Sequence, residues 1–370
     1  MSLVKANTYQ DASGGSNAVF SGVASPPNSM GFRNRIINGD MRIDQRNAGA
    51  SVTPANGNYT LDRWQYEASQ ASKFTVQRNA GSVTPPAGFT NYLGMTVASA
   101  VSVGASDYFI LEQRIEGLNV ADLAWGTASA SSITLSFWVR SSLTGTFSGG
   151  LANSAYNRAY VFSYSISSAN TWEQKTITVP GDTTGTWLTD NGIGIQLRFS
   201  LGAGSTYSAS AGSWGTTAAW NVTGGVSVVG TNGATFYITG VQLEAGTVAS
   251  PFERRDYGRE LMMAQRYYWK LKQSDTSNQF TFGVGAVGSA KDTFFIVNNP
   301  VQMRSAPTAT QSGTVNINYN ASAYAKTAIG GQYAGTITTR ITWNDASLVA
   351  GGATWFDFAS GAYIEFSSEL

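Results

Sequence analysis

The most restrictive feature of this sequence is a set of short segments in which apolar and polar residues alternate with a period of two. Residues 133–140 read ITLSFWVR and residues 193–200 read IGIQLRFS, so most alternate side chains are large and apolar. A strand turns successive side chains to opposite faces of a sheet, so this period predicts strands with one apolar and one polar face. We expect an all-β fold of antiparallel jelly-roll or β-sandwich modules, with the polar faces in solvent.

One predicted strand changes phase part of the way along. Phe236 and Ile238 share one parity, whereas Val241 and Leu243 share the other. An extra residue in a strand produces such a change, and a glycine within a strand often marks the position. We therefore expect a β-bulge at Gly240.

A short helix is predicted from about Asp256 to Lys270. Asp256 can cap its N-terminus, because a carboxylate accepts hydrogen bonds from the free backbone N–H groups there. One stripe of the helix carries Leu261, Ala264, Gln265 and Tyr268. Further apolar residues fall outside this stripe, so one side can pack on its own chain and another on a neighbour. Threefold packing of the helices would satisfy both sides, with an interface of Leu261, Met262, Met263 and Tyr267.

Chemistry that depends on histidine or cysteine is excluded, because the chain contains neither. Without cysteine there is no disulfide framework, thiolate nucleophile or zinc finger. Without histidine, serine triads and the usual zinc hydrolases are excluded as well. We expect no cofactor and no transition metal, although oxygen ligands could still hold calcium.

Paired carboxylates could still hydrolyse a glycan, and this alternative depends on their spacing. Glu112 and Glu116 share a face of the predicted strand 108–116 with Arg114. Four residues of an extended strand separate the two acids by roughly 13 Å, which is too far for glycoside hydrolysis. We interpret them as a solvated face with a cross-strand ion pair, and we expect no enzymatic activity.

The charge distribution argues against nucleic acid and membrane partners. Lys and Arg total 23 against 22 Asp and Glu, and they form no basic cluster. A nucleic-acid interface needs such a cluster to displace counterions. No apolar run reaches the ~18 residues of a membrane span, and the N-terminus has no apolar signal segment. We expect no nucleic acid and no membrane insertion, with synthesis in a cytoplasm.

Segments in four separated parts of the chain give it a family resemblance. Residues 34–46 read NRIINGDMRIDQR, and YTLDRW follows at 59–64. Residues 237–246 read YITGVQLEAG, followed by SPFERR at 250–255 and ELMMAQRYYW at 260–269. Residues 299–308 read NPVQMRSAPT, and the chain ends in Glu369 and Leu370. In this order the segments resemble those of bacteriophage tail fibre and receptor-binding proteins, except that Ala264 stands where many relatives have Cys.

The resemblance implies a virion structural protein with four parts. Residues 1–34 would be an extended arm that attaches to the phage tail or to other virion proteins. Residues 35–252 would form a jelly roll similar to carbohydrate-binding modules, residues 253–272 a helical hinge, and residues 273–370 a distal β-sandwich. The family implies a homotrimer in the virion tail that recognises a host surface glycan or outer-membrane receptor. A glycan-depolymerase tailspike and an architectural head fibre, collar or baseplate adaptor remain alternatives.

Aromatic residues are the candidate ligand contacts, because their faces stack on sugar rings while Ser and Asn side chains match sugar hydroxyls. The uncharged region 201–234 contains Tyr207, Trp214 and Trp220. Tyr333 and Trp343 occupy the predicted distal domain, where Tyr324 is a further candidate. The alternative is that these rings cover the end of a sandwich or a subunit seam, since buried aromatic anchors are common.

Overall fold

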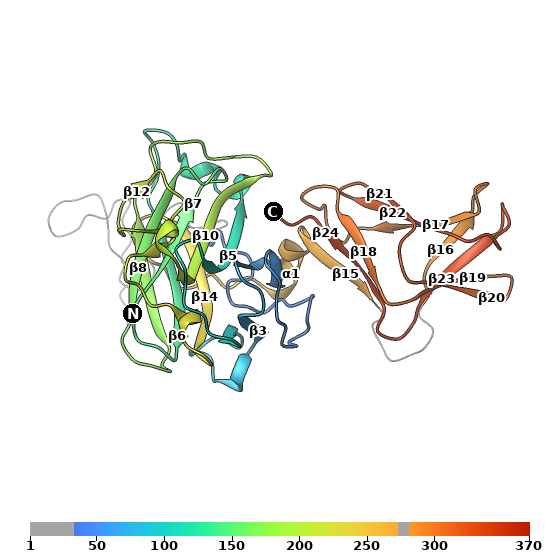
Figure 1. Cartoon of the computed structure of the whole chain (residues 1–370). Coiled ribbons are helices and arrows are strands. Elements are labelled where there is room, and N and C mark those ends of the chain that lie inside the picture. The colour runs from blue at the N-terminus through green and yellow to red at the C-terminus, as the bar shows by residue number, and fades with distance from the viewer. Residues whose placement is uncertain (1–32, 273–280) are drawn as a thin grey trace, which may run out of the picture.

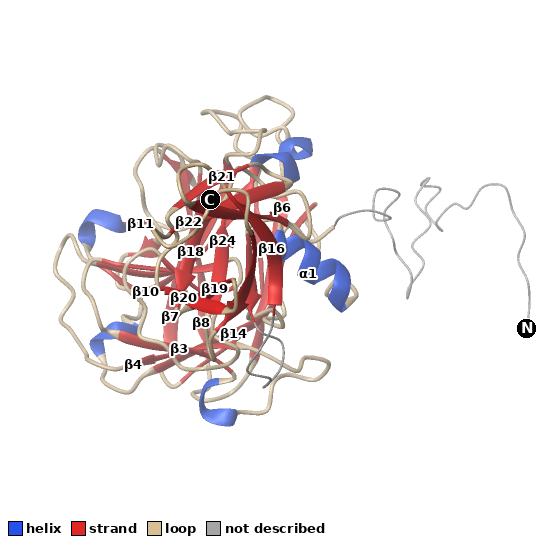
Figure 2. Ribbon diagram, turned by 90° about the vertical axis from the view of Figure 1, so that its right-hand side faces the viewer, coloured by secondary structure: helices blue, strands red, loops and turns tan. Residues whose placement is uncertain are grey.

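Two β lobes, joined by a short helix, make up the computed structural model, which describes residues 33–272 and 281–370 (Figure 1). Seen from the side of the smaller lobe, strands occupy the interior and helices lie at the periphery (Figure 2). None of the helices in residues 33–272 and 281–370 qualifies as a membrane span by length and hydropathy. The arm predicted over 1–34 lies almost wholly outside these residues, but Asn34 is buried in the larger lobe and bonds to the backbone of Val241 and Leu243. The folded part therefore begins before the predicted boundary.

The larger lobe is an antiparallel jelly roll of two sheets with a shared apolar core. One sheet has the order β3-β4-β14-β6-β9 and the other the order β1-β2-β5-β10-β7-β8-β12. The five-stranded sheet contains β3 (Phe74–Arg78), β4 (Leu93–Val97), β6 (Ile133–Ser141), β9 (Glu173–Val179) and β14 (Thr235–Ala245). The seven-stranded sheet contains β1 (Asn58–Leu61), β2 (Trp64–Ala68), β5 (Tyr108–Glu116), β7 (Gly145–Ala152), β8 (Ala159–Ile166), β10 (Ile193–Ala203) and β12 (Trp214–Gly215). Two short strands, β11 (Ser208–Ala209) and β13 (Asn221–Val222), pair separately.

The apolar face predicted for β6 and the bulge predicted in β14 are confirmed, although Thr134 and Ser136 on the polar face of β6 are buried instead of solvated. Ile133, Leu135, Phe137 and Val139 are all fully buried between the sheets. The pairing of β14 with β6 shifts register between Thr239 and Gln242, and Gly240 there has a φ of +61°. A Cβ at this glycine would lie 2.6 Å from the ring of Phe89, so both the backbone and the packing require glycine.

The polar face of β10 does not meet solvent, contrary to the prediction. Gln196, Arg198 and Ser200 are each at most 2% exposed. They point away from the apolar core, but the loops that carry Tyr156 and Trp220 fold over them. This outer face of the seven-stranded sheet is therefore a buried polar layer rather than a solvated surface.

The smaller lobe packs a three-stranded sheet, β15-β24-β18, against a seven-stranded sheet, β20-β19-β23-β16-β17-β22-β21. The strands of the small sheet are β15 (Tyr268–Lys272), β18 (Thr308–Ser312) and β24 (Tyr363–Ser367). The large sheet contains β16 (Thr281–Val287), β17 (Asp292–Asn298), β19 (Val315–Tyr319), β20 (Ser322–Lys326), β21 (Gly331–Ala334), β22 (Thr338–Asn344) and β23 (Ala353–Phe358). The core face of β17 carries Phe295 and Val297, and its other face is also apolar, with Phe294 and Ile296.

The helix is shorter than predicted. Helix α1 spans Tyr257–Gln265, and the Asp256 carboxylate accepts the backbone N–H of Arg259 at 2.9 Å, as expected for its cap. Tyr268 and Trp269, predicted as helical, instead begin β15, whose backbone pairs with β24. Strand pairing with a distant segment thus outweighs the local helical pattern, and the predicted hinge 253–272 ends inside the smaller lobe.

Buried charges tie the two lobes together. Glu369 forms ion pairs with Arg63 and, at 2.8 Å, with Arg46. The two guanidinium groups lie over the rings of Tyr267 and Tyr268 at 3.7 and 3.5 Å from the ring centres. The motif segments 34–46, 59–64 and 260–269 and the end of the chain therefore meet at one junction.

Removing one partner from this junction should destabilise the protein strongly. In Glu369→Ala, Arg63 would keep a guanidinium that is 1% exposed but has lost its carboxylate. A buried charge left without its partner costs about 3–5 kcal/mol, and we expect that loss in the free energy of unfolding from guanidinium titration. Glu173→Ala is the control, because the Glu173–Lys175 pair lies closer to the surface and should cost less than about 1 kcal/mol. Equal costs in the two variants would contradict the assigned role of Glu369.

Asp62 should give the junction a measurable pH dependence. Burial raises the pKa of its carboxyl to about 6, although Arg46 opposes the shift. The folded protein therefore binds a proton more tightly than the unfolded chain, and this contribution to stability grows as the pH falls through about 6. Asp62→Asn cannot titrate, so the melting temperature of the wild type should rise relative to that of the variant between pH 7.5 and about 5. Parallel melting profiles across this range would show that Asp62 is not the titrating group.

Candidate functional site

The candidate site is the outer face of the seven-stranded sheet in the larger lobe. Gln65, Glu112 and Arg198 form one row across it, because Glu112 pairs in register with Gln65 on β2 and with Arg198 on β10. The next position along the row, on β7, is Gly150. A Cβ at Gly150 would lie 2.9 Å from Trp220, so this glycine gives the indole room to pack on the sheet.

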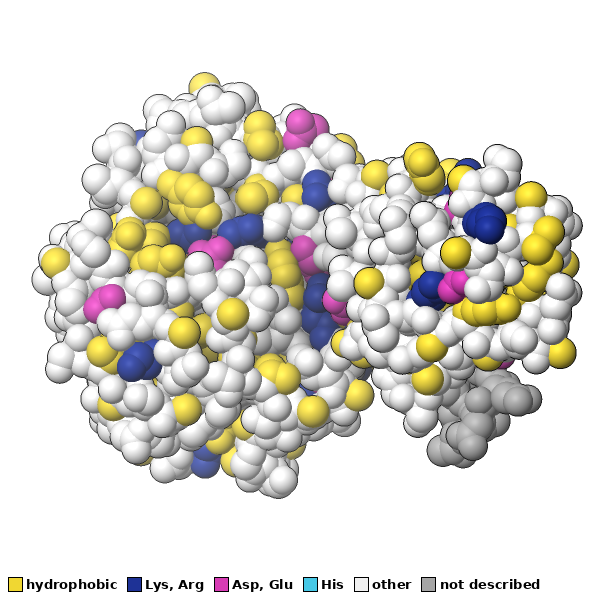
Figure 3. Space-filling view, turned by 45° about the vertical axis from the view of Figure 1, so that its right-hand side comes forward, with side chains coloured by type: hydrophobic (Ala, Val, Ile, Leu, Met, Phe, Trp, Pro, Cys, Tyr) yellow, Lys and Arg dark blue, Asp and Glu magenta, His cyan; other side chains and the backbone are white. Residues whose placement is uncertain are grey.

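A ladder of alternating charges forms the floor of the site. Arg114 donates to Glu67 and to Glu112, each at 2.5 Å, and Glu112 also pairs with Arg198. Arg198 in turn donates to the amide oxygen of Gln196 at 2.9 Å. The two carboxylates and two guanidinium groups balance, so the floor has fixed polar groups but no net charge. In Figure 3, acidic and basic side chains gather in a row on the larger lobe, beside the smaller one.

The ladder contains only Glu112 of the two acids, Glu112 and Glu116, that the sequence analysis considered as a pair. Glu112 and Glu116 are buried rather than solvated, but the expected cross-strand ion pair is present between Glu112 and Arg198. Glu116 belongs to the junction, where its carboxylate accepts from Arg266 and from the Tyr267 hydroxyl, each at 2.6 Å. Burial and, next, the charge of Glu112 raise the pKa of Glu67.

Aromatic rings form the wall of the site. The guanidinium of Arg198 lies over the rings of Tyr156 and Trp220, at 4.5 and 4.6 Å from their centres. Tyr207 stacks on Trp220 with the ring centres 4.5 Å apart, and Tyr108 meets both rings edge-on. Tyr156 is 36% exposed and Tyr207 is half-buried, so the outer rings of this stack are accessible whereas Trp220 is not.

Two buried polar atoms in the site have no hydrogen-bond partner among the described residues. They are the indole Nε1 of Trp220 and the amide Oε1 of Gln65. The Gln65 side chain is oriented by its own Nε2, which donates to the carbonyl of Gly57 at 2.8 Å. Buried polar groups are normally paired, so these two atoms are exceptions, but both are fully enclosed and neither is accessible to a ligand.

The smaller lobe borders the site through the end of the chain. The carbonyl oxygen of Leu370 accepts from the Tyr59 hydroxyl at 3.0 Å and from Arg114 at 2.8 Å. Arg114 therefore belongs to both the charge ladder and the junction. Burial is the largest single effect and lowers the pKa of Arg114, but the combined attraction of Glu112, Tyr59 and Glu67 outweighs it, so the pKa is raised.

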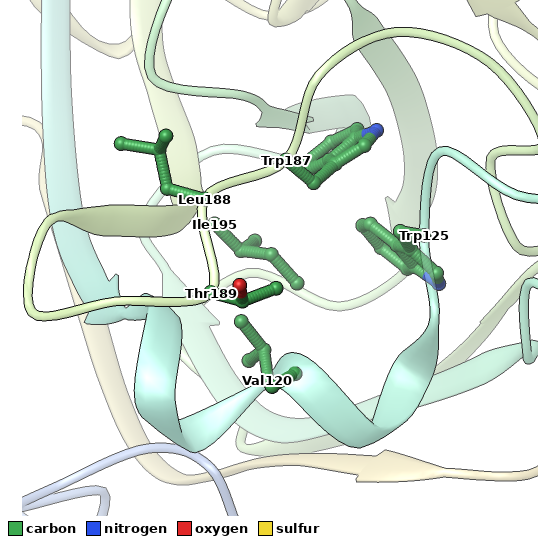
Figure 4. A pocket seen from close by; sticks show the side chains of 7 residues that line it. Val120, Trp125, Trp187, Leu188, Thr189 and Ile195 are labelled. Atoms are coloured by element: carbon green, nitrogen blue, oxygen red, sulfur yellow. The ribbon is translucent and has the colours of Figure 1, made fainter.

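The aromatic residues predicted as ligand contacts do not form one site. Tyr207 and Trp220 come together as described, but Trp214 lies apart at the edge of the sheet, with its indole donating to the carbonyl of Pro180 at 2.8 Å. It packs edge-on against Trp125 and Trp187, and this cluster covers one end of the sandwich. The small void beside Trp125 and Trp187, about 10 Å³, has room for about one water molecule and is far below the usual size of a ligand pocket (Figure 4).

The two candidate ligand contacts in the smaller lobe, Tyr333 and Trp343, also lie in different environments. Trp343 is fully buried in the core of the smaller lobe and donates to Gln311 at 3.0 Å, so its assignment as a ligand contact is wrong. Tyr333 is 71% exposed on β21. Tyr324, the further candidate, is half-buried and packs against the same core as Trp343.

The predicted subunit interface on the helix has the wrong composition. Tyr267 is fully buried under Arg63 and cannot meet a second chain. Leu261 and Met263 pack partly against the buried cluster that joins the helix to the larger lobe, whereas Met262 is 51% exposed. The apolar sides of α1 are thus mostly used within the chain, because the helix lies in the junction instead of standing free.

The sequence analysis did not identify several residues of the site. Tyr108, Tyr156, Glu67 and Arg198 were not singled out as ligand contacts, although Arg198 was assigned to a polar face. The available signals were the charged and amide residues within strongly apolar strands and the adjacent glycines 149 and 150 in β7. The described residues contain no group of acidic side chains that could hold a metal ion.

Comparisons with known proteins give structural neighbours of low similarity. No family model matches the chain, and no curated protein matches its sequence. The enzymatically active domain of tailspike protein 4 from bacteriophage CBA120 is 13% identical with a TM-score of 0.32, over 57% of this chain and 21% of that one. TmCBM61, solved with β-1,4-galactotriose, is 12% identical with a TM-score of 0.31, over 58% of this chain and all of that module. The family 11 carbohydrate-binding module from Clostridium thermocellum, solved with a mixed-linked tetrasaccharide, is 12% identical with a TM-score of 0.27, over 55% of this chain and 99% of that module.

Proposed function

We propose that this protein is a bacteriophage fibre subunit that binds a neutral glycan on the host surface through the outer face of its seven-stranded sheet. The observation that carries the proposal is the stack of Tyr156, Arg198, Trp220 and Tyr207 above a charge ladder with no net charge. The order of the motif segments supports the assignment to a phage fibre. Residues 1–34 would then attach the subunit to the virion, and the subunits would assemble as homotrimers.

The chemistry of the site favours a sugar over other ligands. Ring faces, which Tyr156 and Tyr207 present, suit the apolar face of a pyranose. Since the carboxylates and guanidinium groups are already paired, a charged ligand would have to displace one of them at a high cost in desolvation. A neutral glycan needs no such exchange.

Glycan binding should depend on the accessible rings of the stack. Tyr156→Ala and Tyr207→Ala should each weaken binding of host-surface oligosaccharides about tenfold in calorimetry, since truncating a central contact typically costs more than 1 kcal/mol. Tyr257→Ala is the matched control, because this tyrosine is 56% exposed on α1 and outside the site. Tyr333→Ala tests the smaller lobe in the same way.

Each other result of that experiment identifies a different function. Loss of binding in Tyr333→Ala alone would move recognition to the distal lobe and contradict the proposed site. Absence of binding to any host glycan would favour the architectural alternative. Release of reducing ends from host polysaccharide, abolished by Glu67→Gln, would favour a depolymerase, because Glu67 and Glu112 both contact Arg114.

The arm should be needed for attachment but not for folding. Asn34 and the residues after it already contact the larger lobe, so a chain without residues 1–32 should keep the melting temperature of the full chain. The truncated protein should fail to join fibreless particles, as measured by co-sedimentation with them. Assembly of the truncated chain onto particles at the level of the full chain would refute the role of the arm.

A further inference from the structure

The charge ladder of the candidate site reaches the surface at one end. The side chains of Glu67 and Arg114 are 17% and 16% exposed, whereas those of Glu112 and Arg198 are 0% and 2% exposed. A sugar stacked on an aromatic ring still needs partners for its hydroxyl groups, and the unpaired indole and amide atoms of the site are enclosed. The ion pair of Glu67 with Arg114 is therefore the part of the ladder that a ligand can reach.

Strand register places Glu67 beside the aromatic wall. Glu67 on β2 pairs with Ile110 on β5, and Tyr108 lies two positions along β5 on the same outer face. Diagonal neighbours of this kind are about 7–8 Å apart, within reach of long side chains. Burial and, next, the charge of Glu67 raise the pKa of the Tyr108 hydroxyl, as their proximity requires. Tyr108 in turn meets Tyr207 edge-on, with the ring centres 5.5 Å apart.

The carboxylate of Glu67 is held in place before a ligand binds. Arg114 donates to Glu67 and Glu112, each at 2.5 Å, and to the carbonyl oxygen of Leu370 at 2.8 Å. A guanidinium group with three acceptors has little freedom, so the Glu67 oxygen that it contacts is also fixed. A carboxylate can accept about four hydrogen bonds, so hydroxyl groups can bind Glu67 without displacing Arg114. Such preorganisation lowers the entropy cost of binding.

We propose that Glu67 is the specificity-determining residue of the glycan site. Its carboxylate accepts hydrogen bonds from the hydroxyl groups of a neutral sugar that stacks on Tyr207, and it excludes acidic sugars. This inference rests on the proposed function and names the polar contact of the same site.

Charge is the physical basis of this selectivity. Hydrogen bonds to an ionised acceptor are roughly twice as strong as those between neutral groups. A carboxylate on the ligand would be repelled by Glu67, while the guanidinium groups of Arg114 and Arg198 already have carboxylate partners. The site should therefore prefer a neutral sugar over its acidic counterpart.

The first test uses the neutral oligosaccharide that the full-length chain binds most tightly in a panel of neutral oligosaccharides. Glu67→Gln should weaken its binding about tenfold in calorimetry, because a neutral amide replaces the ionised acceptor. Glu173→Gln is the matched control, since the Glu173 side chain is also 17% exposed and ion-paired but lies on β9, in the other sheet of the lobe. Unchanged melting temperatures show that both variants are folded.

The second test separates a ligand contact from a structural role. Its probes are counterparts of the same oligosaccharide that carry one hydroxymethyl group oxidised to a carboxylate. The wild type should bind them at least about tenfold more weakly than the neutral sugar, and Glu67→Gln should reduce this ratio. A loss of packing would weaken both ligands alike and leave the ratio unchanged. Glu67→Asp keeps the charge, so it should keep the discrimination while binding the neutral sugar more weakly.

Deoxy analogues of the neutral oligosaccharide locate the contact on the ligand. At least one analogue that lacks a single hydroxyl group should bind the wild type about tenfold more weakly but bind Glu67→Gln as well as the parent sugar does. Equal ratios in the wild type and Glu67→Gln, for acidic and deoxy analogues alike, overturn the inference. Tyr207→Ala then still tests the proposed function. If the wild type binds no oligosaccharide at all, the proposed function is rejected and this inference with it.

Discussion

The ion pair between Arg63 and Glu369 joins the first motif of the chain to its last residues, and the arrangement of the two lobes depends on it. Arg63 has a φ of +70°, a conformation that a residue with a long side chain adopts rarely. Its guanidinium is buried between Glu369 and the face of Tyr267, so charge pairing and ring contact hold the unusual backbone in place. The partners are 306 positions apart in the sequence, and their contact brings the end of the chain back to the first strands.

Buried carboxylates paired with guanidinium groups also organise the candidate site. Glu112 lies between two guanidinium groups, and each of its two carboxylate oxygens pairs with one of them. Such pairs contribute less to stability than to fixing side-chain positions. The rings above them are held in place before any ligand arrives, which lowers the entropy cost of binding.

The sequence predicts what depends on local periodicity and leaves open what depends on distant contacts. The core face of β6 and the bulge at Gly240 follow from alternation, because a change of parity must be absorbed in the chain itself. The end of α1 could not be predicted, since it depends on the pairing of Tyr268 with Ser367 about a hundred residues away. The orientation of β17 was equally hidden, because Phe294 and Phe295 fit either face.

The candidate site likewise depends on distant contacts that local periodicity does not predict. Tyr207 and Trp220 were identifiable as rings in an uncharged region, but their separation from Trp214 depends on loop paths that no period encodes. Trp343 is an aromatic residue of the type that often contacts sugars, but it is fully buried in the core. Arg198 was visible as the polar residue of an alternating strand, yet nothing in its neighbours indicated that Tyr156 and Trp220 would cover it.

The return of the chain end has a mechanical consequence. The lobes are connected once by the covalent path through α1 into β15, and again by the residues after β24, which contact Arg46, Arg63 and Arg114. A body held at a single point can swivel, whereas one held at two separated points resists both bending and torsion. A force applied to the smaller lobe is therefore shared between the covalent connection and a set of buried ion pairs. The joint between the lobes resists bending and twisting.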